Sequence, residues 1–401
     1  MRLVKRIFLL LLAVLVAVQV PFIYRRHLIG QLAERIARLE SQRVARVTPG
    51  YREYKGVMHV HTSLGGHSTG SFDELIAAAA ANGLDFVAMT EHYEVRYDTS
   101  RLGLEGPHGG VLFIGGQEID ATDGGRFLVF PGTPDALELS RLDTRTMLGR
   151  LRERGHFAIN NYPERNRSGV EDFDGMEAYS LHINAKRMNP FAAAGDLLWS
   201  FPAYSELTYA TYLRRNEDYL QRYDRIASQR RLLLAAGADA HSNKGYYLFA
   251  DDDGNRHFGF KIDPYEMVLR LVRMHVLIEE GTPLTRESFV DALRRGHAFV
   301  GFDVMGDAGG FAFAAENGTE RRIMGDEIAL ASGVRLTAAA PGEATFVLLR
   351  NGEKVGAIAG VAEANFTADR PGAYRVEVYR DVAGDALTAA PWIMSNPIYI
   401  R

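Results

Sequence analysis

Two histidines at alternate positions are the first residues in this sequence that could do chemistry. His59 and His61 stand in the run VMHVH, where apolar residues precede and separate the two imidazoles. On an extended strand, side chains two residues apart share one face, so both rings could bind one metal ion. Such a pair alone is weak evidence, because chance and core packing produce most of them. His67 follows in a loop rich in glycine and serine, and loops at strand ends often present ligands.

More residues of metal-binding type stand at the ends of other short apolar runs. His92 ends the second predicted strand, and Glu118 ends the third. Asp239 and His241 end a later strand, again at alternate positions. In a barrel of alternating strands and helices, the carboxyl ends of the strands meet at one rim. This convergence favours a metal site over unrelated surface groups, and the expected ligands are His59, His61, His67, His92, Glu118, Asp239 and His241.

The elements that would position these residues alternate between strands and helices from residue 51 to about residue 303. Ser71 and Glu74 form a capping-box pattern that predicts the start of a helix, and Asn82-Gly83 predicts its end. Alternating strands and helices indicate the α/β class, with a parallel sheet or barrel. The predicted strands are 57–58, 86–89, 111–115, 127–130, 157–159, 176–179, 232–236 and 299–302.

After residue 303 the pattern changes to short strands alone. Turn signals at Asn351-Gly352 and Pro371-Gly372 separate these runs. We expect a C-terminal all-β domain over residues 304–401, built as a small sandwich. Packing over the barrel is its expected role.

The N-terminal segment is apolar enough to cross a membrane. Ile7 to Tyr24 contain one strongly polar residue, Gln19, and as a helix they would be roughly 27 Å long, close to the roughly 30 Å of a bilayer core. The following PFIYRR is a poor cleavage site for a signal peptide. We therefore expect an uncleaved transmembrane helix over residues 1–27, with a cleaved signal sequence as the alternative. A short basic N-terminus before a large domain favours a periplasmic or extracellular catalytic domain.

Residues 28–50 connect this helix to the first strand. Their apolar residues recur every three to four positions, which predicts an amphipathic helix. Pro49-Gly50 predicts its end. We expect a solvated juxtamembrane stalk, with a short coiled-coil dimer seam as the alternative. The apolar positions are Leu28, Leu32, Ile36 and Leu39.

The composition narrows the classes of function. The 401 residues, 47% of them hydrophobic and 24% charged, allow one large domain or two smaller ones. The net charge of −4 shows no basic excess, so nucleic acid is not an expected partner. The chain contains no cysteine, so a metal must be bound by His, Asp or Glu. Zn²⁺, Mn²⁺ and Fe²⁺ all suit such nitrogen and oxygen ligands.

The motifs HVHTSLGGH, TEH, GQE and GADAHS, in this order, resemble the PHP (polymerase and histidinol phosphatase) superfamily of metal-dependent hydrolases. The later segments RRGHAFVGFD, GDEI and PWIMSNPIYI resemble its CehA/McbA-like branch, whose members append a small β-domain. The resemblance implies a distorted (β/α)7 PHP barrel over residues 51–303. It also implies two metal sites, one of His59, His61, Glu118 and Asp239, and the other of His67, His92 and His241.

This chain departs from the family at a middle metal site. The family binds up to three metals, and the middle one usually takes two further histidines besides the glutamate. The corresponding places here read Gly125-Arg126 and Asn160-Asn161-Tyr162-Pro163. We therefore expect an empty or weak middle site and two divalent metal ions per chain. In an alternative alignment, His108, His156 or His182 supplies the missing imidazole.

The predicted activity is hydrolysis by metal-activated water, most favourably of a small phosphomonoester or phosphodiester. Asp239 is expected to accept a proton from that water and to act in catalysis with His92 and Arg126. The Arg126 guanidinium suits bidentate contact with a phosphate. The expected substrate-binding residues are Arg126, Lys244 and Arg165. Two alternatives remain: hydrolysis of an ester, amide or carbamate, and a catalytically degenerate metal-binding domain.

Overall fold

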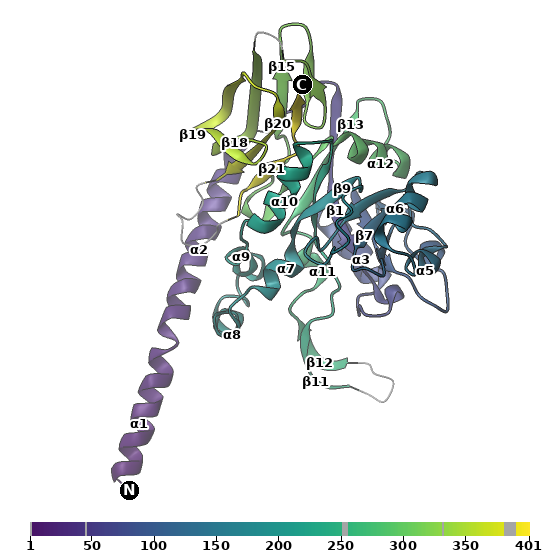
Figure 1. Ribbon diagram of the computed structural model, residues 1–401. Coiled ribbons are helices and arrows are strands. Elements are labelled where there is room, and N and C mark those ends of the chain that lie inside the picture. The colour runs from purple at the N-terminus through teal and green to yellow at the C-terminus, as the bar shows by residue number, and fades with distance from the viewer. Residues whose placement is uncertain (1, 45, 251–255, 331–332, 381–389) are drawn as a thin grey trace.

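Two sheets form the body of the molecule (Figure 1). The computed structural model describes residues 2–44, 46–250, 256–330, 333–380 and 390–401. Within these ranges the strands form a 14-stranded sheet, a 6-stranded sheet and a two-stranded hairpin. The chain is therefore a mixed α/β protein with a strand-rich C-terminal region and an apolar N-terminal helix.

The large sheet runs in the order β16-β15-β18-β20-β21-β14-β13-β1-β2-β5-β4. β1, β2 and β5 are parallel, whereas β13 pairs antiparallel with β1, and β14 with β13. The strands from the first three quarters of the chain are β1 (Tyr51–Val60), β2 (Phe86–Met89), β4 (Gly106–His108), β5 (Val111–Ile114), β13 (Arg273–Glu279) and β14 (Ala298–Gly301).

The smaller sheet runs in the order β10-β9-β8-β7-β6-β3. β10, β9 and β8 are parallel, and so are β3 and β6, but β7 is antiparallel to both of its neighbours. Its strands are β3 (Glu91–His92), β6 (Gln117–Asp120), β7 (Arg126–Phe130), β8 (Phe157–Asn160), β9 (Gly175–Ser180) and β10 (Leu233–Gly237). Each of the predicted strands is thereby confirmed as part of a strand.

Backbone contacts bring the two sheets together at the ends of β1 and β10. The Ala238 amide donates to the Met58 carbonyl at 3.0 Å, and the His61 amide donates to the Ala240 carbonyl at 3.0 Å. On the other side, β2 continues into β3 through Thr90, whose amide donates to the Val60 carbonyl at 2.9 Å. The carboxyl ends of strands from both sheets therefore meet in one place. The closed (β/α)7 arrangement itself stays a prediction.

Helices cover the sheets and connect the strands (Figure 1). The predicted capping box is confirmed at the start of α3, where Ser71 and Glu74 bond each other's backbone, and Asn82 caps the end. The short elements include η1 (Ser63–Gly65) and η2 (Asp303–Met305), and the hairpin consists of β11 (Gly245–Ala250) and β12 (Arg256–Lys261). The helices after the N-terminal segment are α3 (Phe72–Ala81), α4 (Thr99–Leu102), α5 (Ala136–Leu139), α6 (Thr144–Glu153), α7 (Leu181–Lys186), α8 (Pro190–Trp199), α9 (Ser205–Ala210), α10 (Glu217–Ala227), α11 (Tyr265–Val268) and α12 (Arg286–Arg295).

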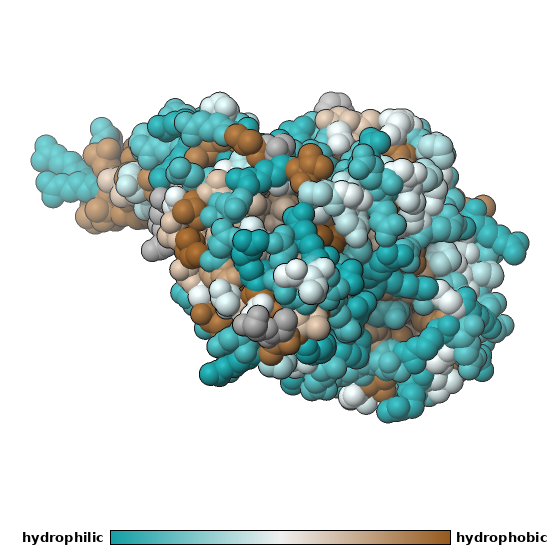
Figure 2. Space-filling model, turned by 90° about the horizontal axis from the view of Figure 1, so that it is seen from above, coloured by the Kyte–Doolittle hydropathy of each residue, from teal (hydrophilic) through white to brown (hydrophobic). Residues whose placement is uncertain are grey.

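The strand-rich C-terminal region continues the large sheet. β21 pairs antiparallel with β14, so backbone pairing crosses the expected boundary at residues 303 and 304. The predicted turn at Asn351-Gly352 joins β18 to β19, with positive φ at both residues. Viewed from this end, the surface of the body is mainly hydrophilic (Figure 2). The strands are β15 (Ala312–Glu316), β16 (Arg321–Ile323), β17 (Glu327–Ile328), β18 (Val334–Arg350), β19 (Glu353–Ala368), β20 (Gly372–Tyr379), β21 (Ile393–Ser395) and β22 (Ile398–Ile400).

The N-terminal segment forms two nearly continuous helices, of which the first projects from the body (Figure 1). α1 (Arg2–Ala17) buries no residue, and α2 (Val20–Ser41) follows after a short turn. Pro21 explains the break, because it has no amide hydrogen to donate to the preceding turn. The segment is long and apolar enough to span a membrane, a property that a signal sequence shares.

The connecting helix is not a solvated stalk, which corrects the expectation for residues 28–50. Ile29 and Leu32 on α2 are buried, and α2 packs against α8 and α9. The other apolar positions of the periodic pattern also pack on the main core. The amphipathic face was predicted, but its partner is the protein's own body, which leaves these side chains unavailable for a coiled-coil seam.

Candidate metal centre

The end of β1 presents two imidazoles to one point, although the strand is irregular there. His59 has a φ of 66°, a left-handed conformation that is costly for a residue with a side chain. The pairing of β1 with β2 shifts register between Met58 and Val60, on either side of His59. Even so, His59 Nε2 and His61 Nε2 lie 3.3 and 3.4 Å from Asp239 Oδ1. The predicted convergence is therefore present, but a local backbone distortion contributes to it, and simple strand alternation does not explain it.

His59, His61 and Glu118 form the first group of side chains that could bind a metal. Their candidate ligand atoms lie within 4.8 Å of one another, and all three residues are buried. The residue that completes this group is Asp239, which lies just after β10 and also has a positive φ, of 47°. These four side chains come from strand ends in both sheets.

His61, His92 and His241 form a second group, again with ligand atoms within 4.8 Å of one another. The His61 ring stacks between the other two, with centroid distances of 4.7 Å to His92 and 4.4 Å to His241. His67 joins this group because its Nε2 atom lies 2.8 Å from that of His241. The two groups thus adjoin at His61, and all seven residues predicted from the sequence lie in one cluster.

The unsatisfied ring nitrogens at the centre fit a bound cation. His59 Nε2 and both ring nitrogens of His61 are buried and have no hydrogen-bond partner among the described residues. An unpaired buried polar group costs about 1–3 kcal/mol. A divalent cation would satisfy several of these nitrogens at once, and the imidazole and carboxylate donors suit Zn²⁺, Mn²⁺ or Fe²⁺.

The charges around the cluster also favour metal binding. Burial alone would raise the pKa of Glu118 and Asp239, but the neighbouring His59 and His61 outweigh it and hold both pKa values below the usual range. Burial, reinforced by His61, lowers the pKa of His92 to about 3 and that of His241 to about 4. At neutral pH these two carboxylates are therefore ionised and these two imidazoles are neutral, as metal ligands must be.

Glu177 on β9 was not predicted from the sequence. Its Oε2 atom lies 2.6 Å from His59 Nδ1, and both side chains are fully buried. Burial works against a protonated ring, but Glu177 and Asp239 outweigh it and raise the pKa of His59 well above its usual value, so this ring must release a proton when it binds a metal. A carboxylate on the outer nitrogen of a ligand histidine fixes the ring's orientation. In the sequence, the indication of this role was a glutamate within the otherwise apolar run 176–179.

Hydrogen-bond donors stand at the positions where the resemblance predicts the missing middle-site histidines. Asn161 Nδ2 donates to Glu118 Oε1, and the Tyr162 hydroxyl donates to Asp239 Oδ2. Arg126 Nη1 lies 3.5 Å from Glu118 Oε1, and its Nη2 donates to Asp120 at 3.0 Å.

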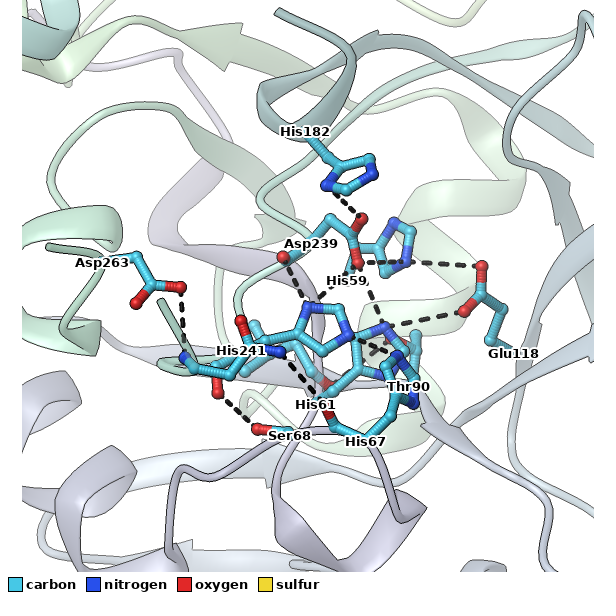
Figure 3. A network of polar contacts seen from close by, with 12 residues as sticks. His59, His61, His67, Ser68, Thr90, Glu118, His182, Asp239, His241 and Asp263 are labelled. Carbon is cyan, nitrogen blue, oxygen red and sulfur yellow. Dashed lines mark hydrogen bonds and ion pairs between the residues drawn. The ribbon is translucent and has the colours of Figure 1, made fainter. Parts of the chain in front are cut away.

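Of the three histidines in the alternative alignment, His182 on α7 lies at the site. Its Nδ1 atom is 3.6 Å from Asp239 Oδ2 (Figure 3). His108 instead contacts the carbonyl of Glu105, and His156 contacts that of Pro131. His182 therefore remains the one candidate of that alignment with the geometry to act at this centre.

A cavity of about 280 Å³ opens from the cluster. Arg126, Arg165 and Lys244 all line it, so the predicted substrate-binding residues share one pocket. The Arg165 guanidinium lies 5.0 Å from the centre of the Tyr162 ring. The lining also includes apolar side chains, namely Leu181, Met188, Leu213, Val268 and Leu271.

Comparisons with known proteins give only distant similarity. No family model and no curated protein matches the chain. One similar solved structure is a two-domain protein from Bacteroides vulgatus that contains a predicted PHP-like metal-dependent phosphoesterase. The two sequences are 14% identical, the match covers 89% of this chain and 97% of that one, and the TM-score is 0.37. Another is PsfC from Pseudomonas syringae, with 13% identity, coverage of 59% and 88%, and a TM-score of 0.34. Similarity at this level carries no argument about function, which rests on the geometry of the site.

Proposed function

We propose that this chain is a metal-dependent hydrolase that acts on a phosphate ester. The observation that carries the proposal is the buried cluster of His59, His61, Glu118 and Asp239, in which several ring nitrogens have no hydrogen-bond partner among the described residues. A purely structural cluster would leave these nitrogens unsatisfied at considerable cost. The motifs quoted above point to the same chemistry through their resemblance to the PHP superfamily.

Two metal ions are proposed, one at each histidine group. Bound divalent cations lower the pKa of water and polarise a phosphoryl oxygen. We propose that the middle site is weak, because Arg126, Asn161 and Tyr162 direct their donors at Glu118 and Asp239. The ligand assignment keeps His59, His61, Glu118 and Asp239 for one ion and His67, His92 and His241 for the other.

The chain's own residues supply proton transfer and substrate binding. Asp239 is ionised and buried, and its Oδ2 atom faces His182, which is partly exposed and can pass a proton to solvent. Arg126, Arg165 and Lys244 place positive charge along the cavity, where it would neutralise a substrate phosphate. His92 contacts Glu118, with a distance of 3.1 Å between His92 Nε2 and Glu118 Oε2.

We also propose that α1 is an uncleaved anchor that leaves the catalytic body outside the cytoplasm. The support is the fully exposed apolar surface of α1 and the packing of α2 on the body. Protease treatment of spheroplasts tests the orientation, because an external body is digested and a cytoplasmic one is protected.

A substrate panel tests the proposed activity. The purified full chain, loaded with Zn²⁺ or Mn²⁺, is assayed on p-nitrophenyl phosphate and p-nitrophenyl acetate. We expect phosphate ester hydrolysis to exceed ester hydrolysis, and Asp239→Asn to lower kcat by about 10²–10⁴-fold. His108→Gln, outside the cluster, is the matched control and should retain activity. Preference for the carboxylic ester would favour the ester, amide or carbamate alternative, and a metal-loaded protein inactive on both would favour a degenerate domain.

A further inference from the structure

α8 packs against the end of the apolar N-terminal run. Trp199 Nε1 donates to Gln19 Oε1 at 2.8 Å, and Arg26 Nη1 donates to the Trp199 carbonyl at 2.9 Å. Gly195 lies so close to Phe22 that an added Cβ would stand 2.2 Å from its ring. α8 therefore packs on the last turns of the apolar run and on the first arginines after it.

The outward surface of α8 is apolar and uncharged. Phe191 is 84% exposed and Leu198 is 65% exposed. The one charged residue of α8, Asp196, is fully buried. Large exposed apolar side chains beside a membrane-spanning helix are unfavourable in water but suit the interface of a bilayer. Trp199 is also of the residue type that is enriched at this level.

A partly buried ion pair connects the N-terminal helix, α8 and the wall of the cavity. Arg25 Nη2 donates to Asp196 Oδ2 at 2.7 Å, and the Tyr212 hydroxyl donates to the same oxygen at 2.5 Å. Tyr212 lines the cavity of the metal centre. The position of the cavity relative to the anchor is thus set by direct contacts between side chains.

Some of the apolar residues that line the cavity lie on or beside α7, α8 and α9. Leu181 is on α7, Met188 lies between α7 and α8, and Leu213 follows α9. Figure 1 shows α8 and α9 on the side of the body from which α1 projects, with α7 further into the body. The opposite end, seen in Figure 2, is mainly hydrophilic. The cavity lining therefore combines metal-binding and charged residues with apolar residues, some of which lie on or beside the elements that neighbour α8.

We propose that α8 rests in the bilayer interface beside α1 and that the substrate is a membrane lipid with a phosphate ester head group. The head group would reach the metal centre, while the apolar chain would pass along Leu181, Met188 and Leu213 toward the bilayer. The substrate class rests on the proposed hydrolase function, whereas the membrane contact of α8 does not. A small soluble phosphate ester would leave the apolar wall without a partner.

Tryptophan quenching tests the membrane contact directly. The chain has two tryptophans, and Trp392 is fully buried. The full-length protein is placed in phosphatidylcholine nanodiscs that contain a brominated lipid, and its emission is compared with that of Trp199→Phe. We expect quenching in the wild type and its loss in Trp199→Phe. Emission from Trp199 that is insensitive to brominated lipid would overturn the proposal.

Kinetics in the same nanodiscs test the substrate class. Phosphatidic acid in the disc is compared with glycerol phosphate and p-nitrophenyl phosphate in solution. We expect a higher kcat/KM for phosphatidic acid, and the double variant Phe191→Ser with Leu198→Ser should lower the ratio of lipid to soluble turnover about tenfold, equivalent to about 1.4 kcal/mol. Val355→Ser, an exposed apolar residue on β19, is the matched control and should keep the wild-type ratio.

The outcomes separate this inference from the proposed function. Hydrolysis of the soluble phosphates without preference for phosphatidic acid would overturn the lipid substrate and leave the hydrolase standing. No hydrolysis of any phosphate by the metal-loaded protein would refute the proposed function and the substrate class together. Neither result would change the quenching measurement, which decides the membrane contact alone.

Discussion

The Nδ1 atom of His59 lies 2.6 Å from the Oε2 atom of Glu177, and neither side chain is accessible to solvent. This contact leaves His59 Nε2 facing Asp239 and Glu118, at 3.3 and 3.6 Å. Glu177 thus sets the direction of a proposed ligand without reaching the proposed metal itself.

Glu177→Gln should weaken metal binding about 10–100-fold, because outer carboxylates of this kind orient the ring and raise its basicity. Titration with Zn²⁺ against a competing chelator measures the change. Glu343→Gln, on the exposed surface of β18, is the matched control. An affinity unchanged by Glu177→Gln would show that the contact is only structural.

The combined variant Arg126→His with Asn161→His should bind one more metal ion than the wild type. It removes two donors that face Glu118 and supplies two imidazoles in their places. Metal content by plasma mass spectrometry gives the result, with each single variant as control. A wild type that already binds three ions would mean that His182 or another group completes the middle site.

Arg375→Met should destabilise the protein by about 3–5 kcal/mol, because it leaves the buried carboxylate of Asp224 without its cation, whereas Glu377 keeps Arg215. Arg375 is fully buried and donates to both oxygens of Asp224 on α10, each at 2.7 Å, and to Glu377 at 2.7 Å. Denaturant unfolding in detergent measures the loss. Arg335→Met, an exposed partner of Glu316, should change stability by less than about 1 kcal/mol. Equal losses of unfolding free energy in both variants would contradict the view that the Arg375 ion pairs matter more because they are buried.

The protein should lose stability in alkali through His275. This ring is fully buried, with Nδ1 2.7 Å from Glu53 and Nε2 3.2 Å from Asp303. Burial opposes its charge, but Asp303 and Glu53 outweigh burial and raise its pKa to about 10. A raised pKa stabilises the fold fully below the unfolded value of about 6.5, and this contribution disappears as the pH rises through about 10.

Unfolding free energies of the wild type and His275→Gln, measured between pH 6 and about pH 10.5, test this account. The difference in unfolding free energy between the two proteins should be largest at the lowest pH and should shrink as the pH rises. A gap that stays constant with pH would show that His275 is neutral in the fold.

The clustering of these side chains could be predicted from the sequence because each was expected at the end of a strand; in the structure His92 ends β3, Asp239 follows β10 and Glu118 lies near the start of β6. His92, Glu118 and Asp239 are far apart in sequence, but alternating elements imply that strand ends share an edge. Glu177 gave no comparable sign, because its contact with His59 depends on how β9 and β1 approach each other across two sheets. No spacing rule encodes that approach.

The packing of α2 illustrates the same limit. The periodic apolar residues of this helix predict a buried face but do not identify what covers it. Ile29 and Leu32 are covered by the chain's own body, where α8 and α9 pack against α2, and those helices come from residues far along the sequence. A solvated stalk was the simpler expectation, and only the tertiary structure corrects it.

The central claim is that the histidine groups bind two metal ions for hydrolysis, and metal content per chain tests it most directly. The full chain is purified without chelator and measured by plasma mass spectrometry, beside His59→Ala, His241→Ala and the control His108→Gln. The account predicts two equivalents in the wild type and in His108→Gln, and fewer in the other two variants. Absence of metal in the wild type, even after reconstitution with Zn²⁺ or Mn²⁺, would contradict it.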